Sequence, residues 1–313
     1  MPQLNAAIRH TLRNHSSPAA VVIVACALAA VCTNAFGQGQ LTEPVYRVAT
    51  EPLTAQATET LATAAPAANA RPDSRVVLDF TQQPGEHPLA PAIRVCKASL
   101  EEIDRNVRDY SCMLVKRERV DGELGEHQHI VLKVRHEPFG VYMNFLKPFQ
   151  GREVVYADGQ YNNELVVLEG GWKRAVGKLH LDPNGVRAMK GQKHPITKVG
   201  IRNLTAQLIR RMEADMKYAE CEVVTKDEKI GARSATMVQV IHPIPRQNFD
   251  AHIARVFFDN ELGIPIHYDA YLWPRQPGGE PPLEESFTYT NLKINNGFTA
   301  RDFDAYNNPE IFQ

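Results

Sequence analysis

Short apolar segments separated by tight turns constrain the fold of this chain more than any other feature of its sequence. The clearest of them cover residues 139–146, 152–156, 164–168 and 172–176 and are rich in β-branched and aromatic residues. Asp158-Gly159 and Gly170-Gly171, which separate three of them, are typical of the turns between antiparallel strands. We therefore expect an antiparallel meander in this region.

Two segments interrupt the strand pattern with a helical period. In residues 92–107 the apolar side chains recur every three or four positions, and in residues 204–216 they recur every four. Further strands are expected at residues 110–115, 129–135, 221–226, 235–241, 254–258, 264–273 and 286–294. This order of helix, strands, helix and strands predicts an α+β domain with one large antiparallel sheet and helices on one of its faces.

The first 37 residues have the layout of a secretory signal peptide. Arg9 and Arg13 precede an apolar run over residues 19–31, and Ala35-Phe36-Gly37 supplies the small residues of a cleavage site. The run is short for a membrane-spanning helix, which needs about 20 apolar residues. The chain is therefore predicted to be exported to the periplasm, with Gln38 as its first mature residue.

Two alternatives would instead anchor the chain to a membrane. An uncleaved signal would act as an N-terminal anchor. Ile23-Val24-Ala25-Cys26 resembles a lipobox, in which Cys26 would carry the lipid. Residues 38–91 are rich in Ala, Thr and Pro and are predicted to form a flexible tether, followed by a single domain over residues 92–313.

Charge and cysteine content exclude several classes of function. The formal net charge is −1, without the excess of Lys and Arg that marks a nucleic-acid-binding protein. Beyond the signal, Cys96, Cys112 and Cys221 form no C-x-x-C motif and allow at most one disulfide. We expect a monomer without nucleic acid, metal or cofactor.

Catalytic motifs give little support for an enzyme. The sequence contains no G-x-S-x-G, H-E-x-x-H, P-loop or G-x-G-x-x-G motif. His127 and His129 would lie on one face of a strand end, which supplies two metal ligands without an obvious third. A hydrolase built around His127, His129 or His194 is one alternative interpretation.

Several motifs together resemble those of an exported bacterial family of unknown function. They are Tyr110-Ser111-Cys112 after the first helix, Arg152-Glu153-Val154-Val155-Tyr156 with Asp158-Gly159 in the meander, His194-Pro195-Ile196, and the tail of residues 287–295 that leads to Phe303. The resemblance covers residues 92–313, and the family's fold is similar to that of the periplasmic lipoprotein carriers and sensors of the Lol and RseB type. It implies an incomplete barrel, in which a curved antiparallel sheet has helices over an apolar concave face.

The resemblance implies a non-enzymatic protein that holds the acyl chains of lipids or lipoproteins in this hollow. Burial of an acyl chain contributes about 0.8 kcal/mol per CH₂, so a dry hollow is enough for binding. The residues expected to line it are Tyr142, Phe145, Val154, Tyr156, Leu165, Val167, Trp172, Leu204, Leu208, Met212 and Met216. The helix over residues 204–216 is expected to lie across the concave face. An alternative is a sensor or interaction module of the same fold that binds an envelope protein.

Overall fold

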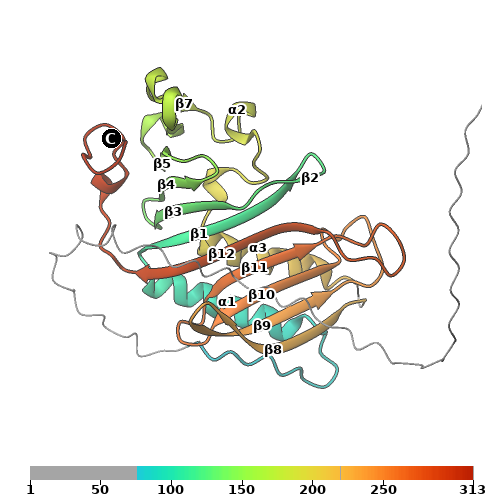
Figure 1. Ribbon diagram of the computed structural model, residues 1–313. Coiled ribbons are helices and arrows are strands. Elements are labelled where there is room, and N and C mark those ends of the chain that lie inside the picture. The colour runs from blue at the N-terminus through green and yellow to red at the C-terminus, as the bar shows by residue number, and fades with distance from the viewer. Residues whose placement is uncertain (1–75, 219, 313) are drawn as a thin grey trace, which may run out of the picture. The chain divides into compact units, whose positions relative to one another are not determined.

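The computed structural model describes residues 76–218 and 220–312, which fall within one compact unit of the chain, residues 68–313 (Figure 1). The predicted signal peptide, the alternative anchors and most of the predicted tether lie outside the described residues. Within the described residues, no helix is both long and apolar enough to cross a membrane.

Twelve strands form one antiparallel sheet. They are β1 (Asp109–Val120), β2 (Glu123–Leu124), β3 (Gln128–Arg135), β4 (Gly140–Lys147), β5 (Arg152–Ala157), β6 (Leu165–Leu168), β7 (Leu179–Leu181), β8 (Glu222–Ile230), β9 (Arg233–Ile241), β10 (Ile253–Asp259), β11 (Pro265–Tyr271) and β12 (Leu283–Ile294). Their spatial order is β7-β6-β5-β4-β3-β1-β12-β11-β10-β9-β8, and β2 pairs with β1 alone (Figure 1). Because β7 and β8 are unpaired edges, the sheet is not closed into a barrel, and the predicted fold class is confirmed.

Strands β1 and β12 join two successive meanders into this one sheet. Both are 12 residues long and pair from Tyr110 opposite Ile294 to Glu118 opposite Glu285. β1 also pairs with β3, which begins the meander that ends at β7, while β12 pairs with β11 of the second meander. Contacts between residues more than 160 positions apart in the chain therefore hold the centre of the sheet.

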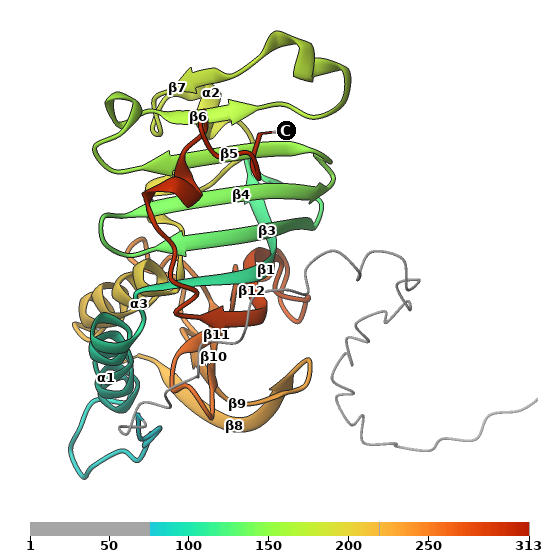
Figure 2. The ribbon, with the colours of Figure 1, turned by 90° about the vertical axis from the view of Figure 1, so that its left-hand side faces the viewer.

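Two long helices pack against the sheet on the side of the second meander. They are α1 (Ala90–Asn106) and α3 (Ile201–Asp215), which run beside each other over β8–β12 (Figure 2). Their buried side chains form one cluster with strands β9 and β10, which includes Ile93, Cys96, Leu208, Ile209, Met212, Val238, Val240, Val256 and Phe258. The shorter helical segments are α2 (Val186–Met189), η1 (Tyr161–Asn163), η2 (Gly171–Val176), η3 (Ile196–Lys198) and η4 (Ala300–Phe303).

A buried tyrosine fixes where α3 begins. The hydroxyl oxygen of Tyr110, on β1, accepts the backbone N–H of Ile201 at 3.0 Å. Gly200 precedes the helix with a φ of +115°, and a Cβ at this position would lie only 3.0 Å from the same hydroxyl oxygen. Glycine is required here because both the backbone conformation and the close approach exclude a side chain.

The predicted boundaries and buried face of this helix are partly wrong. The helix starts three residues earlier than residue 204, and Met216 is its C-terminal cap with 36% of its surface exposed. An α-helix turns once every 3.6 residues, so a stripe repeating every four drifts by about 40° per step and by about 120° from Leu204 to Met216. The buried face instead contains Ile201, Thr205, Leu208, Ile209, Met212 and Asp215.

The predicted strand over residues 172–176 is also wrong. These residues belong to the 3₁₀ helix η2, which lies between Gly170 and Gly177. The next strand of the meander comes later, where β7 pairs with β6 from Leu165 opposite Leu181 to Val167 opposite Leu179. Gly171 has a φ of +60° and Gly177 a φ of +82°, so the backbone turns at both ends of the segment and does not extend along the sheet.

The C-terminal segment covers the face of β4–β6 that points away from α3. Its buried residues Phe303, Ala305, Ile311 and Phe312 form a cluster with Tyr142, Val155, Ala157, Val166 and Leu168. The carboxylate of Asp109 holds the start of this segment, because it accepts the backbone N–H groups of Asn296 at 2.6 Å and of Gly297 and Phe298 at 3.1 Å. This face is therefore filled by the chain itself.

Candidate functional site

A cavity of about 1060 Å³ lies between α3 and the sheet. Ligand pockets are typically about 300–1,000 Å³, so this one is at the upper end of the range. Side chains from both meanders line it, and most are aliphatic or aromatic: Leu114, Met143, Phe145, Val154, Leu165, Val167, Leu179, Leu181, Leu204, Leu208, Met212, Val238, Val240, Val256, Phe258, Phe287 and Tyr289. A surface of this kind favours an apolar ligand, since burial contributes about 25 cal/mol per Å².

The strand register explains why one wall of the cavity is continuously apolar. Met143 of β4 pairs with Val154 of β5, Val154 with Val167 of β6, and Val167 with Leu179 of β7. Paired residues of neighbouring strands lie on the same face of a sheet. These four side chains therefore form one row across four strands, and all four line the cavity.

The structure places seven of the eleven predicted lining residues in the wall of the cavity. They are Phe145, Val154, Leu165, Val167, Leu204, Leu208 and Met212. The other four, Tyr142, Tyr156, Trp172 and Met216, lie outside it. Binding of a ligand by any of these residues stays a prediction.

The four misplaced residues have separate physical reasons. Tyr142 is three positions from Phe145, so the alternation of a strand puts the two on opposite faces, and the Tyr142 hydroxyl donates to Glu153 at 2.8 Å. Tyr156 packs in the core beside Phe139, with 6.1 Å between the ring centroids. Trp172 is 83% exposed because η2 leaves the sheet, and Met216 follows the drift of the helix stripe described above.

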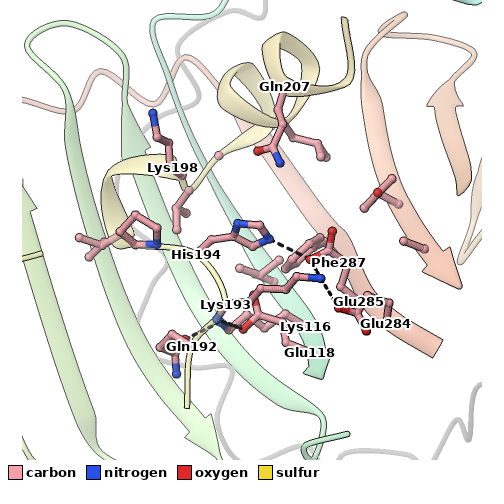
Figure 3. Close-up of a pocket in the computed structure, with 18 of the residues that line it drawn as sticks. Lys116, Glu118, Gln192, Lys193, His194, Lys198, Gln207, Glu284, Glu285 and Phe287 are labelled. Carbon is pink, nitrogen blue, oxygen red and sulfur yellow. Dashed lines mark hydrogen bonds and ion pairs between the residues drawn. The ribbon is translucent and has the colours of Figure 1, made fainter. Parts of the chain in front are cut away.

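A polar cluster within the cavity was missed by the sequence prediction. The inward face of β1 continues from Tyr110, Cys112 and Leu114 to Lys116 and Glu118, both of which are buried. Side chains on one face of a strand recur every two residues. Extending this pattern four residues beyond Leu114 would have identified Lys116 and Glu118. The other members of the cluster come from distant segments of the chain, so no local sequence pattern predicts them. They are Gln192, Lys193, His194, Glu284 and Glu285 (Figure 3).

The Lys116–Glu118 pair is the most buried part of this cluster. Lys116 Nζ lies 2.9 Å from Glu118 Oε2 and donates to Gln192 Oε1 at 2.5 Å (Figure 3). The two charged side chains are 9% and 3% exposed. Charges removed from water to this degree need a partner, and here each is the partner of the other.

The second half of the cluster joins the loop before η3 to β12. Lys193 Nζ lies 2.6 Å from Glu284 Oε1 and 3.4 Å from Glu285 Oε2, and His194 Nε2 lies 2.8 Å from the same Glu285 oxygen (Figure 3). The other carboxylate oxygen of Glu284 is 3.6 Å from Arg119 Nε. Three carboxylates thus face two lysines, an arginine and a histidine, so every carboxylate of the cluster lies beside a basic side chain.

The pKa of Glu285 makes this cluster sensitive to acid. Burial raises the pKa of the carboxyl, but the hydrogen bond from His194 and the charges of His194 and Lys193 outweigh burial and hold it below its ordinary value of 4.5. An acid whose pKa is depressed by folding contributes stability above the unfolded pKa, and loses it as the pH falls through the folded pKa.

We therefore expect the urea midpoint to fall as the pH drops below about 4.5, and to fall less steeply in Glu285→Gln. The measurement is urea unfolding between about pH 3 and pH 7. The exposed Glu123→Gln is the control and should keep the wild-type slope. Equal acid slopes for wild type and Glu285→Gln would show that His194 and Lys193 do not stabilise the charged form of this carboxylate.

A second polar group lies near the C-terminal end of α3. His242 is 5% exposed, stacks on Phe249 at 3.9 Å between ring centroids, and places Nε2 3.4 Å from Asp215 Oδ2. Arg211 Nε also lies 3.2 Å from the Asp215 carboxylate. The cavity is therefore lined by polar side chains of α3 as well as by the aliphatic row of β4–β7.

The described residues offer few groups suited to catalysis. They contain no set of three or more His, Cys, Asp or Glu side chains placed to hold a metal ion. Cys96, Cys112 and Cys221 are free thiols, and burial raises the pKa of Cys96 to about 12 and that of Cys221 to about 11. Thiols with such pKa values are poor nucleophiles at neutral pH.

Of the three histidines of the hydrolase alternative, His127 and His129 interact with each other, and His194 hydrogen-bonds to a different partner. His129 lies in β3, and burial together with the charges of Arg117 and His129 lowers the pKa of His127. His194 belongs to the polar cluster, where its hydrogen bond goes to Glu285.

Comparison with known protein families gives one match. A family described as "Protein of unknown function (DUF1571)" matches residues 107–312. Among curated proteins, no sequence matches.

Three solved structures are similar at low identity. The lipoprotein LppX of Mycobacterium tuberculosis is 14% identical, over 69% of this chain and 100% of its own, with a TM-score of 0.39. A DUF1329 family protein of Desulfovibrio piger is 8% identical, over 70% and 98%, with a TM-score of 0.35. A LolA superfamily protein of Nitrosomonas europaea is 8% identical, over 67% and 97%, with a TM-score of 0.28.

Proposed function

The chain belongs to the DUF1571 family, whose description assigns no function, and from the chain's own geometry we propose that the cavity holds the acyl chains of a lipid or lipoprotein. The observation that carries this proposal is the unbroken apolar row from Met143 to Leu179, which lines the same cavity as Leu204, Leu208 and Met212 of α3. A flexible hydrocarbon chain matches such walls because it needs no directed hydrogen bond.

The energetics support the same ligand class. Each buried CH₂ contributes about 0.8 kcal/mol, so a chain of about 10 carbons recovers about 8 kcal/mol before the cost of ordering it. The polar cluster gives such a ligand an orientation, because an ester or headgroup would lie near Lys193 and His194 and the hydrocarbon along β4–β7. We further propose that the protein is exported, monomeric and not an enzyme.

Ala254→Phe is expected to abolish binding of an acyl probe. Ala254 lines the cavity on β10, and a phenyl ring there would occupy the space of the ligand. We expect at least a tenfold weaker affinity for a fluorescent fatty acid, measured by titration in solution. Ala188→Phe, on α2, is a second blocking variant, while Ala232→Phe in the exposed β8–β9 turn is the matched control.

Solvent extraction of the purified protein, followed by mass spectrometry, tests for a ligand acquired in the cell. Wild type and the Ala232→Phe control should release the same lipids, and Ala254→Phe should release fewer. Wild-type protein that is repeatedly empty and binds no acyl probe would contradict the proposal. Capture of one envelope protein by both Ala254→Phe and wild type would then favour the interaction module.

A further inference from the structure

One short segment of the chain carries a concentrated positive charge. Residues 170–198 contain seven lysines and arginines against a single aspartate, a net charge of +6 in a chain whose total is −1. The segment runs from η2 through the edge strand β7 to η3. Figures 1 and 2 both place β7 and α2 at the end of the sheet opposite to β8. Five of the seven cations belong to the part from η2 to Lys190 at this end, whereas Lys193 and Lys198 lie nearer β12 and α3 (Figure 3).

Several of these cations have no counterion among the described residues 76–218 and 220–312. Lys173, Arg187, Lys190 and Lys198 are exposed, and none of the four forms an ion pair within the described part of the chain. All four also line the cavity, so the cavity reaches solvent beside them. Unpaired cations around an opening attract an anionic surface, over a distance set by the ionic strength.

Exposed apolar side chains lie among the same cations. Trp172 is 83% exposed, Val176 65% and Val186 89%. Trp172 precedes Lys173 and Val186 precedes Arg187, and Lys173 Nζ lies 6.0 Å from the centre of the Trp172 ring. Tryptophan favours the level of the lipid headgroups, and Lys and Arg are drawn to anionic lipids, so this combination is typical of a protein surface that docks on a bilayer.

We infer that Trp172, Lys173, Val176, Val186, Arg187 and Lys190 form a docking surface for an anionic phospholipid bilayer. This inference goes beyond ligand binding in the cavity, because it assigns a partner to the outside of the molecule. Docking at this end would place the opening of the cavity against the membrane, from which an acyl chain could enter without crossing water. The exposed valines and tryptophan would insert at headgroup depth, and the cations would contact lipid phosphates.

The experiment uses the processed, exported chain with vesicles of phosphatidylglycerol and phosphatidylcholine, and vesicles of phosphatidylcholine alone as the comparison. The chain has two tryptophans, so Trp273→Phe leaves Trp172 as the fluorescent reporter. We expect co-flotation with the anionic vesicles and a blue shift of Trp172 emission. Both effects should disappear on neutral vesicles and at about 1 M salt, where the Debye length is about 3 Å.

Charge reversal locates the contact. Arg187→Glu/Lys190→Glu should weaken binding to anionic vesicles at least about tenfold, because each cation near an anionic surface contributes a separate attraction. Lys229→Glu/Lys293→Glu, with the same charge change on exposed residues of β8 and β12, should bind within about twofold of wild type.

Four outcomes would overturn the inference: no binding to anionic vesicles at low salt, equal binding to neutral vesicles, an equal loss in both charge-reversal variants, or an unshifted Trp172 emission in the bound protein. Its failure can be told apart from failure of the proposed function, because wild-type binding of the fatty-acid probe is measured in solution without vesicles.

Discussion

Replacing Lys116 by methionine is expected to lower the free energy of unfolding by about 3–5 kcal/mol. The substitution keeps the length of the side chain but removes the charge 2.9 Å from Glu118, whose side chain is 3% exposed. The carboxylate would then be left in the cavity wall with Gln192 displaced and only the backbone N–H of Lys193, at 3.4 Å, beside it. An uncompensated buried charge is among the most destabilising changes known in a core.

The double variant Lys116→Met/Glu118→Leu should recover most of that loss, since an apolar pair of similar volume replaces the ion pair. Urea unfolding of the two single variants and the double variant gives the coupling between the residues. Lys226→Met is the matched control, because Lys226 and Glu228 have the same spacing on β8 and lie 2.8 Å apart with 50% and 35% exposure. The free energy of unfolding of Lys226→Met should fall by less than about 1 kcal/mol. A comparably small loss in Lys116→Met would mean that the charge of Glu118 is satisfied without the lysine.

Phe303→Ala is expected to destabilise the domain by about 3–5 kcal/mol. Phe303 is fully buried in η4 and contacts β4 so closely that a Cβ at Gly140 would lie 3.1 Å from its ring. The guanidinium of Arg135 lies 5.1 Å from the same ring. Loss of the phenyl group would leave a void beneath the C-terminal segment, and the segment would hold its face of the sheet less firmly. The measurement is again the free energy of unfolding in urea.

Phe149→Ala is the control for this change, because Phe149 is 38% exposed and its truncation should cost less than about 1 kcal/mol. The proposed function depends on this cover. Because Phe303 and the C-terminal segment fill one face of β4–β6, only the face toward α3 is available to a ligand. A loss for Phe303→Ala no greater than that for Phe149→Ala would show that the C-terminal segment is not a structural cover.

The elements of the fold were predictable because their signals are local. The strands of the meander, both long helices and the α+β class follow from apolar periods of two and of three to four. Two of the errors, Met216 and Tyr142, arose where a period was read too loosely: residues four apart do not stay on one face of a helix, and residues three apart do not share a face of a strand. Attention to the same period would have replaced Tyr142 by Met143 and continued β1 to Lys116 and Glu118.

The sequence by itself determined the DUF1571 family, the class of fold, and seven of the apolar residues that line the cavity. Only the tertiary structure decided which sheet face stays open. The C-terminal segment fills one face of β4–β6 with Phe303, and α3 faces the other across a cavity.

The polar cluster was likewise decided by the tertiary structure, because Lys116 and Gln192 are 76 positions apart and His194 and Glu285 are 91 apart. No local pattern records which distant side chains will meet. Their positions follow from the pairing of β1 with β12 and from the point at which Tyr110 fixes the start of α3. A cavity forms where two packed surfaces leave space between them. Its presence depends on how elements from several parts of the chain curve and pack, and not on any single segment.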